Sequence, residues 1–268
     1  MNKNASQWLL GLLLVAFPLA TLVLVLSLAN LPASYFTVDA ELASDDLSST
    51  TLLPDFAAID QTPERKAQFL AMLRPLVDEK NAKLLKSRAR LLKLKAEWDA
   101  TQTVSGVNKR NLEKLREKFH VTYETYPEDG KAIEILLLRV DVIPPAMVLA
   151  QAAVESGWGT SRFAEEAHNL FGHWCYKPGC GIVPSKRASG AKHEVKKFNS
   201  VEESLTAYFN NINTHNAYRP WRQLRAQLRD QPEQFTGKAM VAELGKYSGR
   251  GSVYIDELRT LIRSNNLE

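Results

Sequence analysis

One carboxylate, that of Glu155, ends an otherwise apolar stretch and is placed to donate a proton. A Pro-Pro pair can open a helix over residues 145–156, with Asp141 as its N-terminal cap, and Gly157 can end it. Burial among apolar side chains and the negative end of a helix both raise the pKa of a carboxyl group. A carboxylic acid that keeps its proton near neutral pH is the general acid that cleavage of a glycosidic bond requires.

Two motifs surround this carboxylate: Ala-Val-Glu-Ser-Gly-Trp-Gly at 153–159 and Asn-Leu-Phe-Gly at 169–172. With them the chain resembles, over residues 133–264, the glucosaminidase family of peptidoglycan hydrolases (glycoside hydrolase family 73) of the lysozyme-like superfamily. The resemblance implies an α+β, predominantly α fold, in which a lysozyme-like helical lobe and a small β-hairpin lobe enclose a glycan groove. In the family a glutamate at the end of a helix protonates the departing sugar oxygen, which implies that Glu155 is the catalytic acid.

The closing turn matches the family less closely. Relatives carry Tyr-Ala-Thr-Asp-Pro-x-Tyr there, whereas residues 247–254 read Tyr-Ser-Gly-Arg-Gly-Ser-Val-Tyr. The Asp-Pro pair is missing and the spacing to the second tyrosine is longer. The resemblance therefore implies a catalytic role for Tyr247, with a packed ring and a hydrogen-bonded hydroxyl group as the alternative.

Many relatives also carry an acidic residue in the β-lobe that positions water, and the candidate here is Glu194. Its basic neighbours Lys192, Lys196 and Lys197 are expected to lower its pKa, although they fit a simple surface strand equally well. Without a second carboxylate, the 2-acetamido group of the substrate can act as the nucleophile. We expect Glu194→Gln to cause a substantial but incomplete loss of activity.

Aromatic side chains near these motifs are candidates for stacking on sugar rings, although such residues more often belong to a core. The candidates for substrate binding are Trp158, Phe171, Trp174 and Tyr218. Asn169 is expected to hold either the acetamido group of the substrate or its own loop. Neither a metal ion nor an organic cofactor is implied.

Charge is unevenly distributed along the 268 residues. Residues 37–60 contain six acidic residues and no basic one, whereas residues 61–268 contain 33 basic and 24 acidic residues. A basic catalytic segment suits murein, whose stem peptides carry carboxylates. Nucleic acid would suit the charge equally, but no nucleic-acid motif accompanies it, so we expect no nucleic-acid partner.

The N-terminus contains an apolar run from Trp8 to Ala29, which is long enough to cross a bilayer. Lys3 precedes the run and the first charges after it are acidic, which orients the short end towards the cytoplasm. We therefore expect a single-pass inner-membrane anchor with the catalytic domain in the periplasm. The alternative is a cleaved signal peptide, because Ser27-Leu28-Ala29 offers small residues at a suitable spacing.

The two cysteines, Cys175 and Cys180, flank a Pro-Gly turn. In an oxidising compartment they are expected to form a small loop-closing disulfide. His173 is the nearest histidine, but no spacing typical of a structural zinc site is present.

The sequence divides into four parts: an anchor or signal segment (1–30), a flexible acidic linker (31–62), a helical region (63–128) and the catalytic domain (129–268). Pro75 is expected to kink or reset the first helix. Residues 173–198 break the helical pattern and predict one or two short β-hairpins. The remaining helices are expected at 81–99, 107–121, 129–142, 145–156, from Ser200 to about 212, and at 219–230, 231–244 and 255–263, with the segment 161–167 between two of them.

The resemblance thus implies an endo-β-N-acetylglucosaminidase that cleaves the β-1,4-glycosidic bonds of murein, with Glu155 as its general acid. One alternative is a lytic transglycosylase, which also uses a single acidic glutamate but cleaves after N-acetylmuramic acid. Another is a catalytically silent module that binds the cell wall.

Overall fold

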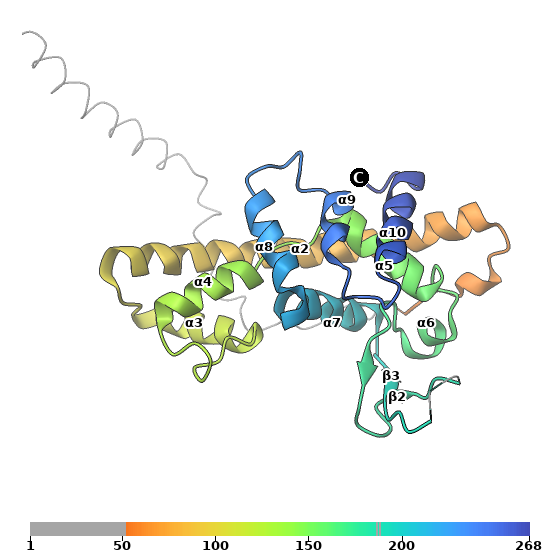
Figure 1. The fold of residues 1–268 in the computed structure, drawn as a ribbon, viewed down its shortest axis with the longest axis horizontal. Helices are drawn as coiled ribbons and strands as arrows, with labels where there is room; N and C mark the ends of the chain where they lie inside the picture. The colour runs from red at the N-terminus through yellow and green to blue at the C-terminus, as the bar shows by residue number, and fades with distance from the viewer. Residues whose placement is uncertain (1–51, 186, 188) are drawn as a thin grey trace, which may run out of the picture. The chain divides into compact units, whose positions relative to one another are not determined.

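The computed structural model describes residues 52–185, 187 and 189–268, and the anchor predicted at 1–30 lies outside them. Within these residues, no helix has the length and apolar character needed to span a membrane. Helices predominate, and a small sheet projects below them in Figure 1. In chain order the elements are η2 (Phe56–Ala58), α2 (Thr62–Thr101), α3 (Gly106–Lys118), α4 (Asp129–Arg139), α5 (Pro145–Ser156), α6 (Arg162–Ala167), β1 (Trp174–Cys175), β2 (Gly181–Ile182), β3 (Glu194–Lys196), α7 (Val201–Thr214), η3 (Asn216–Tyr218), α8 (Arg219–Leu228), α9 (Gly237–Met240), η4 (Val241–Glu243) and α10 (Ser252–Ser264).

The longest helix, α2, runs uninterrupted for 40 residues and carries Pro75 in its interior. The sequence predicted a kink or a new start at this proline, and the prediction of a new start is wrong. Leu73 and Val77, on either side of it, are both fully buried, so packing offsets the loss of one backbone hydrogen bond. α2 packs against both α4 and α5, so the predicted helical region 63–128 and the catalytic domain share one core.

The predicted linker ends earlier than residue 62. Phe56, in the 3₁₀ turn η2, is fully buried and packs edge-to-face on Phe69 of α2. It also lies against Gly159, where an added Cβ would stand 2.5 Å from its ring. Because the ring of Phe56 is buried between α2 and the turn after α5, this segment belongs to the folded core.

The connection between α4 and α5 is fixed by polar side chains from other helices. Asp141, predicted as the helix cap, is instead buried and forms ion pairs with Arg88 of α2 and with Arg229. Three residues separate it from the first turn of α5, and the last of them, the N-cap Pro144, makes no side-chain hydrogen bond. Asn81 of α2 binds both the N–H and the carbonyl group of Ile143. Side chains of α2 and Arg229 therefore fix the position of the residues that precede α5.

The segment 173–198, which we name the β-lobe, forms a three-stranded antiparallel sheet in the order β1-β3-β2. The consecutive strands β2 and β3 confirm one of the one or two predicted hairpins, and β1 pairs with the other edge of β3. Ser200 caps α7 as predicted, by accepting a hydrogen bond from the N–H group of Glu203. The helix predicted at 231–244 is wrong, because a turn precedes the short elements α9 and η4 there.

Candidate active site

Glu155 lies in the last turn of α5, and Gly157 ends the helix in the left-handed conformation, as predicted. The carboxyl group is partly buried, and this burial is the main cause of a raised pKa. The negative charge of Glu257 raises the pKa further, whereas a hydrogen bond with Tyr254 and the positive charge of Arg250 oppose the shift. The predicted direction of the shift is therefore confirmed, with desolvation as its dominant cause.

A chain of hydrogen bonds links Glu155 to the interior. Tyr208 donates to Oε1 of Gln151 at 2.5 Å, and Nε2 of Gln151 donates to the hydroxyl oxygen of Tyr254 at 3.0 Å. The hydroxyl group of Tyr254 in turn bonds the carboxyl group of Glu155. All three supporting side chains are fully buried. They fix both the position of the carboxyl group and the direction of the donor that faces it.

The sequence analysis missed these three supporting residues. One signal was present, because a glutamine in an apolar helix, one turn before the acid, lies on the same helical face. The two tyrosines carry no comparable signal, since they lie 57 and 103 residues away from Gln151 along the chain.

Tyr247 belongs to the same aromatic cluster. Its ring lies parallel to that of Tyr254 at 5.9 Å, and its hydroxyl group donates to the carbonyl oxygen of Phe171 at 2.9 Å. Burial raises its pKa well above the usual value, so the hydroxyl group keeps its proton. This is the packed arrangement considered as the alternative, and the catalytic role of Tyr247 stays a prediction.

Two of the predicted sugar platforms lie in the core. Phe171 is 2% exposed and stacks on Tyr208 at 4.2 Å, and Tyr218 is 6% exposed beside Tyr247. Asn169 uses its amide group within its own loop, where it donates to the carbonyl groups of His173 and Lys196.

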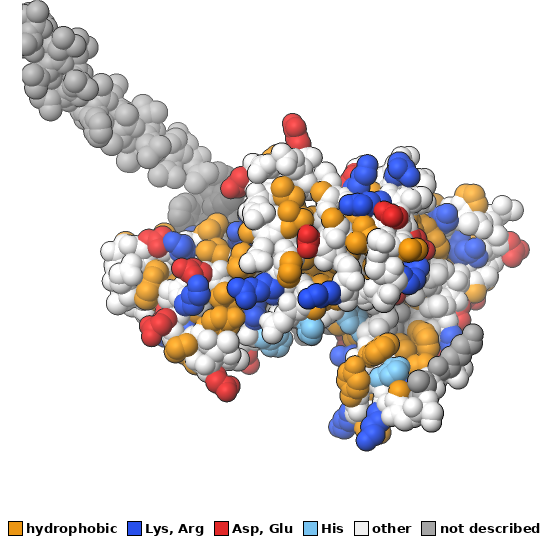
Figure 2. Space-filling view, in the orientation of Figure 1, with side chains coloured by type: hydrophobic (Ala, Val, Ile, Leu, Met, Phe, Trp, Pro, Cys, Tyr) orange, Lys and Arg blue, Asp and Glu red, His pale blue; other side chains and the backbone are white. Residues whose placement is uncertain are grey.

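The other two platforms reach the surface. Trp174, on β1, is 56% exposed and stacks on His193 at 4.1 Å. Trp158 is partly exposed, packs edge-to-face on Phe69 and lies beneath the ammonium group of Lys66. Figure 2 shows the surface indented between the β-lobe, at the lower right, and the helical body. Gly172 ends the loop that leads towards the lobe, and a Cβ there would stand 3.5 Å from Oε2 of Glu155.

Glu194 is 8% exposed at the start of β3. Its two oxygens accept backbone hydrogen bonds from Gly179 at 3.0 Å and from Gly181 at 2.9 Å. These bonds lower its pKa, with a smaller effect from Arg187. The predicted direction is confirmed, but the predicted cause, the neighbouring lysines, is wrong.

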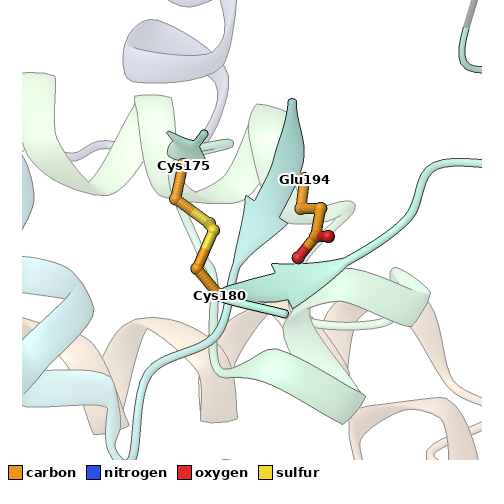
Figure 3. Close-up of side chains that lie close together, drawn as sticks. All are labelled: Cys175, Cys180 and Glu194. Carbon is orange, nitrogen blue, oxygen red and sulfur yellow. A yellow bond between two sulfur atoms is a disulfide. The ribbon is translucent and has the colours of Figure 1, made fainter. Parts of the chain in front are cut away.

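The predicted disulfide joins Cys175 and Cys180 and closes the loop that Glu194 binds (Figure 3). The two sulfur atoms and a carboxylate oxygen of Glu194 lie within 4.8 Å of one another. Such a group could suggest a metal site, but sulfur atoms bonded to each other are not the thiolates that bind metal ions.

Comparison with known proteins assigns this chain to a family. Residues 131–267 match the glucosaminidase family model, described as mannosyl-glycoprotein endo-beta-N-acetylglucosaminidase. The chain belongs to the glucosaminidase family, as its motifs predicted, and so carries a glycosidase domain. It is similar to Protein bax of Escherichia coli (strain K12), with 33% identity over 228 residues, which is 83% of this chain and 77% of that protein. No solved structure matches the chain.

Proposed function

We propose that the protein is a peptidoglycan hydrolase that cleaves the β-1,4-glycosidic bond after N-acetylglucosamine in murein, with Glu155 as the general acid. The observation that carries the proposal is the partly buried Glu155 carboxyl group, whose pKa is raised and which Tyr254 holds at the end of α5. Membership of the glucosaminidase family supports a glycan as the substrate. The basic charge of residues 61–268 supports a polyanionic one.

In the proposed reaction, Glu155 transfers its proton to the glycosidic oxygen as the bond from that oxygen to C1 breaks. The acetamido oxygen of the same N-acetylglucosamine attacks C1 and forms a cyclic oxazolinium ion, which keeps the amide proton. Water then opens this ring, and the Glu155 carboxylate takes the proton from that water. The hydrogen bond from Tyr254 stabilises the carboxylate between the two steps. We favour the acetamido route over water placed by Glu194, because both oxygens of Glu194 already bind the disulfide loop.

The test of this assignment is Glu155→Gln with purified murein as the substrate. Loss of the general acid should reduce the rate by roughly 10²–10⁴-fold without changing the unfolding midpoint. The control is Glu165→Gln, which alters an exposed carboxylate ten residues along the chain and should leave the rate unchanged. Near wild-type activity in Glu155→Gln would remove Glu155 from the reaction.

Mass spectrometry of the wild-type digest separates the three candidate functions. Fragments with a reducing N-acetylglucosamine end support the proposal. A 1,6-anhydro-N-acetylmuramic acid end would assign a lytic transglycosylase, and an undigested glycan that still binds the protein would assign a silent wall-binding module.

The proposed location is the inner membrane, with the catalytic domain in the periplasm. The apolar run from Trp8 to Ala29 and the disulfide, which suits an oxidising compartment, support this location. In spheroplasts, external protease should digest the catalytic domain while the protein sediments with membranes. Protection from the protease would contradict the proposed orientation.

A further inference from the structure

A hollow of about 440 Å³ lies between the beginning of α2, the turn after α5 and one face of α10. α2 contributes Lys66, the turn contributes Trp158, and α10 contributes Glu257, Thr260 and Ser264. The three α10 positions follow one another at intervals of three or four residues, so their side chains form one stripe along the helix. The volume falls within the range of roughly 300–1,000 Å³ that is typical of ligand pockets.

The hollow is a neighbour of the proposed catalytic acid. Glu257 lines the hollow, and its charge also acts on the carboxyl group of Glu155. Arg250 forms an ion pair with Glu257 at 2.6 Å and places its guanidinium 5.0 Å from the ring centre of Tyr254, which holds the acid. Trp158, which also lines the hollow, follows Glu155 by three residues, so the hollow and the proposed acid share the turn that ends α5.

Lys66 gives the hollow a cation that is positioned but not neutralised. Its ammonium group lies 5.0 Å from the ring centre of Trp158, which restrains it by a cation–π contact. Among the described residues, the contact of this ammonium group is with the ring of Trp158 and not with a carboxylate. The lining also includes two carboxylates of α10, Asp256 and Glu257, whose cationic partners, Arg259 at 3.7 Å and Arg250 at 2.6 Å, are not part of the lining. One cation and two carboxylates therefore line the hollow.

The helix that supplies Lys66 lies outside the part of the chain that defines the family. The family match covers residues 131–267, whereas α2 spans Thr62–Thr101. The hollow is therefore built from the catalytic domain and an added helix. Because α2 lies next to the proposed glycosidase site, it can contact a part of the substrate other than the sugar whose bond is cleaved.

We propose that this hollow binds the stem peptide of murein, with a peptide carboxylate on Lys66 and a peptide ammonium group on the carboxylates of α10. The inference rests on the proposed function and adds a peptide requirement to it. Stem peptides carry several carboxylates and, in diaminopimelate-type murein, a free amine, which matches the two kinds of charge that line the hollow. Charge-assisted bonds of this kind are stronger than neutral ones and weaken as salt is added.

The test compares two substrates: intact murein, and the same glycan strands after an amidase has removed the peptides. Lys66→Glu should reduce kcat/KM on intact murein about tenfold through KM, and change it less than twofold on the stripped glycan. The control Lys93→Glu makes the same charge change on an exposed position of α2, about 40 Å away at 1.5 Å per residue, and should affect neither substrate. Equal losses on both substrates, or no loss on intact murein, would overturn the proposal.

A binding measurement tests the hollow without turnover. The probe is the free tetrapeptide L-Ala–D-Glu–diaminopimelate–D-Ala, titrated into the full chain by calorimetry. Binding to the wild type should weaken at least fivefold in Lys66→Glu and with added salt, and should persist in Glu155→Gln. If murein is not cleaved but the tetrapeptide binds in this pattern, the proposed function fails and the peptide site stands. If the wild type does not bind the tetrapeptide, the peptide site fails on its own.

Discussion

The helical body and the β-lobe are stabilised in different ways. In the body, α2, α4, α5 and α10 share one apolar core. The buried side chains of Arg139, Arg222 and Arg225 donate hydrogen bonds to backbone carbonyl groups there. In the β-lobe, strands of two or three residues bury few apolar side chains, chiefly Val195 and Phe198 among those described. Instead of a core, the disulfide and the two backbone hydrogen bonds that Glu194 accepts stabilise the lobe. An element that cannot bury much apolar surface needs covalent or polar restraints instead.

The two regions also contribute different parts of the proposed active site. The acid and its supporting residues Gln151, Tyr208 and Tyr254 all belong to the body, where burial holds them rigidly. The lobe supplies the exposed Trp174. Changes in the body should therefore alter folding or proton transfer, and changes in the lobe should mainly alter local order.

The largest expected effect comes from Arg225, on α8. Its fully buried guanidinium donates to the carbonyl oxygens of Leu138, Asp141 and Val142, which lead into α5. Arg225→Met removes these buried hydrogen bonds, as well as the one to Oδ1 of Asn213, and should lower the free energy of unfolding by about 3–5 kcal/mol, measured by urea denaturation. Arg162→Gln removes an exposed ion pair with Glu166 and should cost less than about 1 kcal/mol. A similar small loss in both variants would contradict the role given to buried arginines.

In the β-lobe, the double variant Cys175→Ser/Cys180→Ser should have a smaller and local effect. The disulfide closes a short loop, so its removal should cost about 2 kcal/mol, mostly within the lobe. Hydrogen exchange should accelerate in β1, β2 and β3 while the body keeps its protection. Equal acceleration in α5 would show that the two regions unfold as one unit.

The chain of hydrogen bonds that ends at Glu155 predicts how the activity of a Tyr254 variant should depend on pH. The hydroxyl group of Tyr254 stabilises the carboxylate form of Glu155, so Tyr254→Phe should raise the pKa of Glu155 further. Activity requires the protonated acid and is lost as pH rises through this pKa, so the alkaline limb of the pH–rate profile should move to higher pH. Tyr218→Phe removes a hydroxyl group that bonds Asn211 and should leave the limb in place. An unmoved or lowered limb in Tyr254→Phe would exclude the proposed hydrogen bond to the acid.

The smallest expected effect on activity is that of Glu194→Gln. The glutamine amide can accept one of the two backbone hydrogen bonds but not both, so the disulfide loop should loosen at Gly179 and Gly181. Activity on murein should fall less than about tenfold, below the range typical of a lost acid–base group. A loss as severe as that of Glu155→Gln would assign Glu194 to the reaction and exclude the acetamido route.

Local patterns in the sequence predicted much of the fold. The apolar run bounded by prolines and Gly157 predicted α5, Ser200 predicted the start of α7, and the Pro-Gly turn predicted the disulfide. Each of these features depends on neighbouring residues. The errors arose where distant partners decide the outcome: Asp141 binds arginines of α2 and of the segment after α8 rather than capping α5.

In the candidate site, too, the features that depend on neighbouring residues could be predicted, and those that depend on distant residues could not. The raised pKa of Glu155 could be predicted from its own helix, because burial and helix position are visible in the local pattern. The hydrogen bonds of Glu194 could not be predicted in this way, because the backbone N–H groups that it binds belong to residues 13 and 15 positions earlier in the sequence. Its lysine neighbours in sequence were a poor guide to its neighbours in space.

The disulfide has a consequence for how the chain matures. The chain contains two cysteines, so a single intramolecular pairing exists and no incorrect pairing has to be undone. The partners are five residues apart, so they meet often even in an unfolded chain. Oxidation therefore need not wait for the helical body to fold, and the crosslinked loop can exist before the strands and Glu194 assemble around it.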